Sequence, residues 1–242
     1  MKNASQLALL LSLLASCQIE KEARNIEAFY FPLQSLKDGK VYEYQSVGNP
    51  NDPPVYWLYH SEKADGEEFL LGTAYSPEFL PDQSIREKRV DNGMKLTEFS
   101  TWETDSTGER RQVQASIQAG NVFPFLVKEN PGVLLTSLRW QSSQADSATL
   151  SLVRNRQFDK DTTVIFQGEK TAAVKFQVRE LVDQEIEGHL ELEYGGEEVY
   201  AKGIGLVFFK KDINKDWKMA YELAAIYDLK AFEEKFKTKL ER

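Results

Sequence analysis

The chain has 242 residues, of which 41% are hydrophobic and 12% aromatic. This is enough apolar material for one sizeable core, and it excludes a wholly disordered chain. The formal net charge of −8, with no basic stripe to offset it, argues against phosphate backbones as partners, so we expect no nucleic-acid binding. The single cysteine, Cys17, excludes a disulfide framework.

The first 16 residues have the pattern of a secretory signal. Lys2 supplies a positive charge, residues 7–15 are apolar, and small residues follow up to Ser16. The apolar run is far shorter than the roughly 20 residues that span a bilayer, and no longer run follows it. We therefore expect residues 1–16 to be removed and the remaining body to lie outside the bilayer.

The end of this segment, Leu14-Ala15-Ser16-Cys17, resembles the lipobox of bacterial lipoproteins. The resemblance implies cleavage between Ser16 and Cys17 and a lipid on Cys17, which would tether the body to a membrane of the bacterial cell envelope. Gln18 stands where an aspartate in enterobacterial lipoproteins signals inner-membrane retention. Its presence favours the outer membrane and leaves the periplasmic or surface face open.

Residues 17–25 are polar and charged, as expected of a short tether. Beyond them, apolar and polar residues alternate, which is typical of half-buried strands. In residues 112–119, for example, Val113, Ala115, Ile117 and Ala119 share one face. The same alternation appears in residues 174–179, 189–194 and 217–223.

Turn signals separate these runs at short intervals. Asp91-Asn92-Gly93 predicts a hairpin, because Asn-Gly suits a tight two-residue turn. We count about ten to twelve strands without the helices that parallel βαβ units need. The fold class predicted is mainly β, a single antiparallel curved sheet of half-barrel or sandwich type in one domain over residues 26–242.

One helix is predicted, at about residues 228–241. Asp228 can cap a segment in which Leu229, Phe232, Phe236 and Leu240 follow helical spacing. This amphipathic helix is expected to pack its apolar stripe on a sheet face or across a barrel mouth.

Two stretches carry a second resemblance. Tyr200-Ala201-Lys202-Gly203-Ile204-Gly205-Leu206-Val207 is similar to the late strand-turn-strand segment of exported β proteins, and Gly39-Lys40-Val41-Tyr42-Glu43-Tyr44 fits the opening of the same group. That group resembles the LolA/LolB lipoprotein carriers, which implies a half-barrel able to hold acyl chains. Physically, Gly203 and Gly205 would permit a bend or a close approach to the sheet.

Catalytic and metal-binding patterns are sparse. His60 and His189 stand far apart in the sequence, so we expect no metal site, no cofactor and no serine triad. Three carboxylate pairs leave a glycan hydrolase open: Glu67-Glu68, Glu191/Glu193 and Glu197-Glu198. Neighbours on a strand point to opposite faces, so Glu197 and Glu198 cannot serve one site. We expect no enzyme.

Aromatic residues mark the candidate binding region. Tyr56, Trp57 and Tyr59 lie in a strand that is apolar on both faces, and they are the predicted lining of a ligand cavity. The function predicted is a membrane-anchored, non-enzymatic binding or carrier module for an apolar or lipid-like ligand. A scaffold subunit that binds an envelope protein partner is the first alternative, and a carboxylate-dependent glycan hydrolase is the second.

Overall fold

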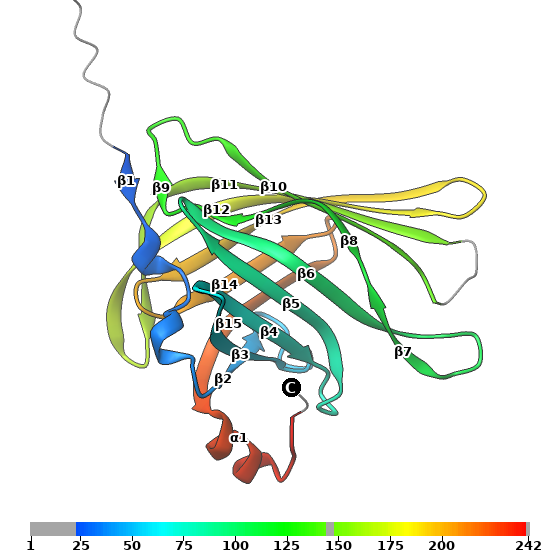
Figure 1. Ribbon diagram of the computed structural model, residues 1–242, viewed down its shortest axis with the longest axis horizontal. Coiled ribbons are helices and arrows are strands. Elements are labelled where there is room, and N and C mark those ends of the chain that lie inside the picture. Colours follow the sequence, from blue (N-terminus) through cyan, green and yellow to red (C-terminus); the bar gives the residue numbers. More distant parts are fainter. Residues whose placement is uncertain (1–22, 144–147, 241–242) are drawn as a thin grey trace, which may run out of the picture.

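The computed structural model describes residues 23–143 and 148–240 (Figure 1). Two short 3-10 turns, η1 (Glu27–Phe29) and η2 (Leu33–Ser35), precede most of the strands, and the helix α1 (Leu229–Phe236) ends the fold. The strands are β1 (Arg24–Asn25), β2 (Lys40–Ser46), β3 (Val55–Ala64), β4 (Glu67–Tyr75), β5 (Pro81–Val90), β6 (Gly93–Thr104), β7 (Arg110–Gln114), β8 (Ser116–Phe123), β9 (Leu126–Val127), β10 (Val133–Gln141), β11 (Thr149–Phe166), β12 (Glu169–Glu185), β13 (His189–Ala201), β14 (Gly205–Asp212) and β15 (Lys218–Asp228).

Twelve of these strands form a closed barrel in which sequence neighbours pair antiparallel. The order runs from β2 through β6, continues through β8 and β10 to β15, and returns to β2. The closing pair joins the first and last barrel strands, with Tyr42 opposite Ile226 and Tyr44 opposite Leu223. β7 extends β6 beyond the part that pairs with β8.

The expected half-barrel or sandwich is therefore wrong, and so is the half-barrel implied by the resemblance to LolA/LolB. A half-barrel would leave two unpaired strand edges, whereas closure pairs their backbone N–H and C=O groups. The sheet is antiparallel, as predicted, and the Asp91-Asn92 turn joins β5 to β6 in a tight hairpin with Val90 opposite Gly93.

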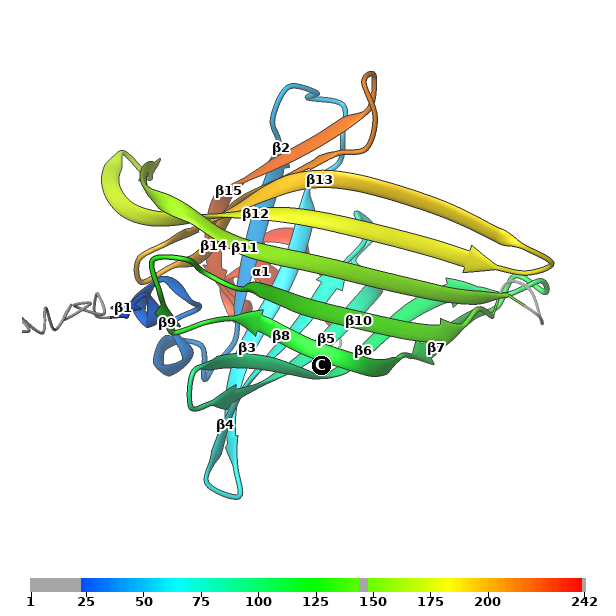
Figure 2. The same cartoon turned by 90° about the horizontal axis from the view of Figure 1, so that it is seen from above.

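Side-chain alternation divides each barrel strand between the interior and the outer surface. The direct partners Phe158, Phe176 and Glu198 share the inner side, and so do Arg154, Glu180 and Tyr194. In Figure 2, β11, β12 and β13 run side by side along the length of the molecule. These three long strands thus carry both aromatic and charged side chains into the interior.

α1 is shorter than the helix predicted over residues 228–241. It ends at Phe236 because Lys237 adopts a left-handed conformation with φ of 51°. Asp228 is its N-cap residue, but the Asp228 side chain makes no capping hydrogen bond. α1 packs on the outer surface of the barrel (Figure 1). Its Phe232 ring contacts the Tyr56 ring there. In the described part of the chain, no helix is long and apolar enough to span a bilayer.

Candidate functional site

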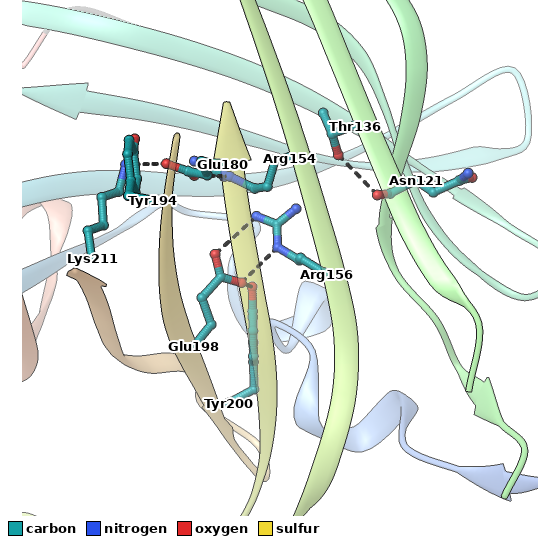
Figure 3. Close-up of polar contacts among 9 residues, drawn as sticks. All are labelled: Asn121, Thr136, Arg154, Arg156, Glu180, Tyr194, Glu198, Tyr200 and Lys211. Carbon is teal, nitrogen blue, oxygen red and sulfur yellow. Dashed lines mark hydrogen bonds and ion pairs between the residues drawn. The ribbon is translucent and has the colours of Figure 1, made fainter. Parts of the chain in front are cut away.

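Five charged side chains meet inside the barrel. They are Arg154 and Arg156 of β11, Glu180 of β12, Glu198 of β13 and Lys211 of β14 (Figure 3). We call this group the inner charged cluster. Strand register brings its members together. Arg154 lies directly opposite Glu180 on the neighbouring strand. Lys211 lies opposite Gly196, which is two residues from Glu198 on the same face of β13.

The deeper half of the cluster is a bidentate ion pair. Arg156 Nε donates to Glu198 Oε2 at 2.8 Å, and Arg156 Nη2 donates to Glu198 Oε1 at 3.2 Å. The Tyr200 hydroxyl donates to Glu198 Oε2 at 3.0 Å. Burial alone would raise the pKa of Glu198, but the positive charges of Arg156 and Arg154 and these hydrogen bonds outweigh it and lower that pKa. Glu198 is thus held ionised.

The other half is a triad centred on Glu180. The Glu180 carboxylate is 2% exposed, accepts a hydrogen bond from Arg154 Nε, and lies 2.9 Å from Lys211 Nζ. Burial raises the pKa of Glu180, yet the charges of Arg154 and Lys211 lower it to about 2. Burial and the Arg154 charge in turn lower the pKa of Lys211. With two cations around one carboxylate, the triad links β11, β12 and β14 across the inner side of β13.

A third interior carboxylate behaves in the opposite way. Glu87 of β5 accepts a hydrogen bond from the Tyr30 hydroxyl, and both residues are buried. Burial raises the pKa of Glu87, and the hydrogen bond from Tyr30 and the charge of Arg156 offset this only in part. Beside Glu180 and Glu198, whose pKa values are lowered, Glu87 is thus a carboxyl that favours its proton.

A raised and a lowered carboxyl pKa side by side is the arrangement that glycosidases use for their acid and base. Here Glu87 and Glu198 are both buried, and none of the described cavities is lined by both. Among residues 23–143 and 148–240, no group of three His, Cys, Asp or Glu residues could hold a metal ion.

The segment that follows the predicted tether closes one end of the barrel. Residues 26–36, which we call the plug, bury a set of apolar side chains: Ile26, Phe29, Tyr30, Phe31, Leu33 and Leu36. The Phe31 ring lies 4.3 Å from the Tyr59 ring and 5.7 Å from the Tyr42 ring, measured between centroids. β1 pairs with β9 just before the plug, so the last two residues of the predicted tether belong to the folded body.

Phe31 fits because of a missing side chain on β14. A Cβ added at Gly205 would lie 2.5 Å from Phe31 Cδ1, and Gly205 has a φ of +101°. Of the two glycines singled out in the sequence, Gly205 thus leaves room for an aromatic ring. Nothing lies within 4 Å of the corresponding point at Gly203.

A ligand-sized cleft lies at the plugged end. Its volume is about 730 Å³, which is within the range of small-molecule sites. Plug residues and Phe125 form most of its apolar wall. Its polar wall combines side chains of the plug with Glu68 of β4 and Arg89 of β5. The lining residues are Asn25, Glu27, Ala28, Tyr30, Phe31, Pro32, Leu33, Gln34, Ser35, Glu68, Arg89, Phe125, Lys202 and Gly203.

The charges around the cleft are mostly paired. Arg89 Nη2 lies 2.5 Å from Glu27 Oε1, and Arg89 Nη1 lies 3.6 Å from Glu68 Oε2. Glu68 also accepts from Lys63 at 2.9 Å, and the pKa of Glu68 is lowered by that hydrogen bond. Lys202, exposed in the β13–β14 turn, has no acidic partner among the described residues. The cleft therefore offers an apolar wall with one available cation.

The predicted cavity residues fall on two sides of the barrel wall. Tyr59 faces inward, where it contacts Phe31 and stacks on Trp57 with ring planes 4° apart. Tyr56 faces outward and is covered by Phe232 and Phe236 of α1. None of Tyr56, Trp57 and Tyr59 lines the cleft. Strand alternation accounts for the separation, since adjacent residues of β3 point to opposite faces.

Other predicted site residues lie elsewhere. Ser16 and Cys17, the predicted cleavage and lipidation residues, lie outside the described part of the chain. His189 of β13 is exposed and bonds to Asp183 at 3.0 Å. Glu197 and Glu198 do point to opposite sides: Glu197 bonds to Lys175 at 2.9 Å on the outer side, whereas Glu198 is inside.

The sequence patterns considered above did not predict the inner charged cluster, although the sequence contains one indication of it. Val174, Phe176 and Val178 define an apolar strand face, and the next residue on that face is Glu180. A charge in such a position predicts a buried partner, because an unpaired buried charge is costly. The cleft left no comparable signal, since the plug has no regular periodicity.

Comparisons with known proteins give the fold alone. The sequence matches no protein-family model, and no curated protein is similar to it. A candidate exported protein with a YmcC-like fold from Bacteroides fragilis NCTC 9343 superposes with a TM-score of 0.51 and 12% identity, covering 82% of this chain and 98% of that one. A candidate lipoprotein from Parabacteroides distasonis ATCC 8503 gives a TM-score of 0.49 and 10% identity, covering 81% and 95%. At these identities, the first likeness shows that the chain has a fold of the YmcC-like type.

Proposed function

We propose that the chain is a lipid-anchored protein of the bacterial outer membrane that binds a single-chain amphiphile in the cleft at its plugged end. The observation that carries this proposal is the cleft itself, about 730 Å³ in volume, largely apolar and bordered by Lys202. An acyl chain suits the wall of plug residues and Phe125, and an acidic head group suits the Lys202 ammonium.

The anchoring part rests on the Leu14-Ala15-Ser16-Cys17 sequence and on the shared fold with a candidate exported protein. Gln18 after the cysteine supports the outer membrane. Because Cys17 is the only cysteine, acylation would leave the body without a thiol, and the binding function needs none.

The binding part also rests on how the interior of the barrel is filled. Both carboxylates of the inner charged cluster are occupied by its three cations, so a ligand deep inside would have to displace these ion pairs. The plug fills the interior beside it. A ligand is therefore best accommodated at the plugged end, where the cleft is open to solvent.

Two experiments test the two parts separately. Cells that express the chain and take up radiolabelled palmitate should label the parent chain and leave the Cys17→Ser variant unlabelled. Equal label in the two chains, or none in either, would contradict anchoring at Cys17.

For binding, the Cys17→Ser chain purified without detergent should show a second mass in native mass spectrometry, offset by a single acyl-type molecule. Mild organic extraction should remove this mass and leave the folded chain intact. A clean ligand-free mass after gentle isolation, together with no uptake of added dodecanoate, would overturn the binding proposal.

A further inference from the structure

The described chain begins at the plugged end of the barrel, next to one particular hairpin. Arg24 of β1 forms an ion pair with Asp161 of β11, and the Arg24 guanidinium lies 5.7 Å from the centre of the Phe158 ring. In Figures 1 and 2 the end of β1 and the turn between β11 and β12 lie at the same end of the molecule. The point where the tether enters the fold is thus fixed against β11.

Beyond this contact, the β11–β12 hairpin carries an exposed apolar tip. Ile165 is 78% exposed, the largest exposure among the large hydrophobic side chains of the described residues. Its neighbours Val164 and Phe166 are half-buried and pack against the core, which holds the tip in place. Lys170, directly opposite Ile165 in the strand pair, is also exposed. An isoleucine beside a lysine on a firm hairpin suits the interface between lipid chains and head groups.

The length of the tether decides which parts of the body can touch a membrane. Arg24 lies seven residues after Cys17, and seven fully extended steps of the chain span at most about 25 Å. Ile165 lies four residues past Asp161, about 13 Å along the strand. The tether is therefore long enough for the tip to reach the surface to which Cys17 is attached.

The opposite end of the barrel is out of reach. Ile186, in the β12–β13 turn, is 48% exposed. It lies twelve residues along β12 from Val174, the partner of Asp161, which is about 40 Å at the rise of an extended strand. This distance exceeds the tether, so an equally apolar tip at that end cannot touch the same surface.

We infer that the tip of the β11–β12 hairpin, led by Ile165, inserts into the lipid bilayer that holds Cys17. This inference rests on the anchoring in the proposed function and adds an orientation to it. The plugged end then faces the membrane, and the cleft lined by Ala28 and Lys202 lies at that end. An amphiphile would pass between the bilayer and the cleft without crossing bulk water.

The experiment uses the single thiol of the chain to build the anchor chemically. The chain from Cys17 onward, which retains every described residue, is coupled through Cys17 to maleimide-bearing lipid in phosphatidylcholine vesicles. Ile165→Trp and the matched Ile186→Trp are compared with the parent, and the fluorescence of the added tryptophan is measured in vesicles with and without brominated acyl chains. Because coupling is chemical, the result does not depend on whether cells acylate Cys17.

Brominated chains should quench the added fluorescence of Ile165→Trp at least twofold and leave that of Ile186→Trp unchanged. An Ile165→Asp/Phe166→Trp double variant should fold, by circular dichroism, and lose the quenching that Phe166→Trp shows alone. Equal quenching at positions 165 and 186, or none at 165 in a coupled and folded chain, would overturn the orientation. Failure of palmitate labelling in cells would instead count against anchoring and leave the vesicle result standing.

Discussion

Arg156 and Glu198, which lie on strands separated by β12, join through two hydrogen bonds of 2.8 and 3.2 Å inside the barrel. The Arg156 side chain is 8% exposed and that of Glu198 11%. A pair this deeply buried is costly to assemble but still more costly to break on one side, because the remaining charge stays buried without a partner.

Glu198→Gln should therefore destabilise the fold by about 3–5 kcal/mol, since Arg156 loses its counter-charge. Urea unfolding followed by circular dichroism measures the change. The matched control is Glu234→Gln on α1, whose contact with Lys230 is 3.9 Å long and exposed, and a change of at most about 0.5 kcal/mol is expected there. Equal effects of the two substitutions would contradict the role assigned to Glu198.

Glu87→Gln should not lower the free energy of unfolding at neutral pH, in contrast to Glu198→Gln. Burial raises the pKa of Glu87 in the folded chain above its ordinary value of 4.5, so its ionisation opposes folding once the pH exceeds that ordinary value. Glutamine mimics the protonated acid and keeps an oxygen that can accept from Tyr30. The variant should be at least as stable as the parent at pH 8 and should lose any advantage at pH 4. Urea unfolding at both pH values tests this, and a loss at pH 8 as large as that of Glu198→Gln would contradict it.

Glu180 should make the barrel sensitive to acid. Its pKa is lowered from 4.5 to about 2 in the folded chain, so it adds stability above its unfolded pKa and loses that contribution as the pH falls towards 2. At about 1.4 kcal/mol per pKa unit, the contribution is about 3 kcal/mol. Between pH 4.5 and 2, the unfolding free energy of Glu180→Gln should fall less steeply than that of the parent. If the unfolding free energies of the two chains fell in parallel over this pH range, Glu180 would make no such contribution.

Gly205→Ala should loosen the plug. The added Cβ would meet the Phe31 ring at 2.5 Å, whereas Gly203→Ala meets nothing within 4 Å. Both glycines have positive φ, so both substitutions carry a backbone cost of about 1 kcal/mol, and only Gly205→Ala adds the clash. Hydrogen exchange should quicken at the amides of Tyr30 and Leu36, which bond to the Glu27 and Leu33 carbonyls, in Gly205→Ala and stay near the parent rate in Gly203→Ala. Protection that is unchanged in Gly205→Ala would show that the plug does not depend on this fit.

Two-residue alternation and the Asp91-Asn92 turn predicted an antiparallel β domain because strands and tight hairpins are encoded locally. Closure of the barrel was missed because it depends on β2 meeting β15, as in the pair Tyr42 and Ile226. Those residues are far apart in the sequence, and the local sequence around each of them does not indicate which strand it pairs with. A half-barrel and a closed barrel have the same local pattern and differ only in whether two edges meet.

The site was predicted less well, for a related reason. The aromatic strand of β3 was recognised, but its alternation sends Tyr59 to the plug and Tyr56 to α1, so the residues never shared one cavity. The cleft depends on how an irregular segment, residues 26–36, folds into the barrel end. This segment is held by long-range contacts, for example the hydrogen bond between Tyr30 and Glu87. The periodicity of the sequence does not predict contacts of this kind.

Ligand binding in the cleft is tested by a calorimetric titration of the Cys17→Ser chain with dodecanoate, compared with two tryptophan variants. Ala28 lines the cleft and is exposed, so Ala28→Trp should fill it and weaken binding at least tenfold. Ala231 is exposed on α1, away from the cleft, and Ala231→Trp should bind like the parent. The predicted result is saturable binding by the parent that is weakened at least tenfold in Ala28→Trp alone; no binding by the parent, or equal binding by all three chains, would contradict it.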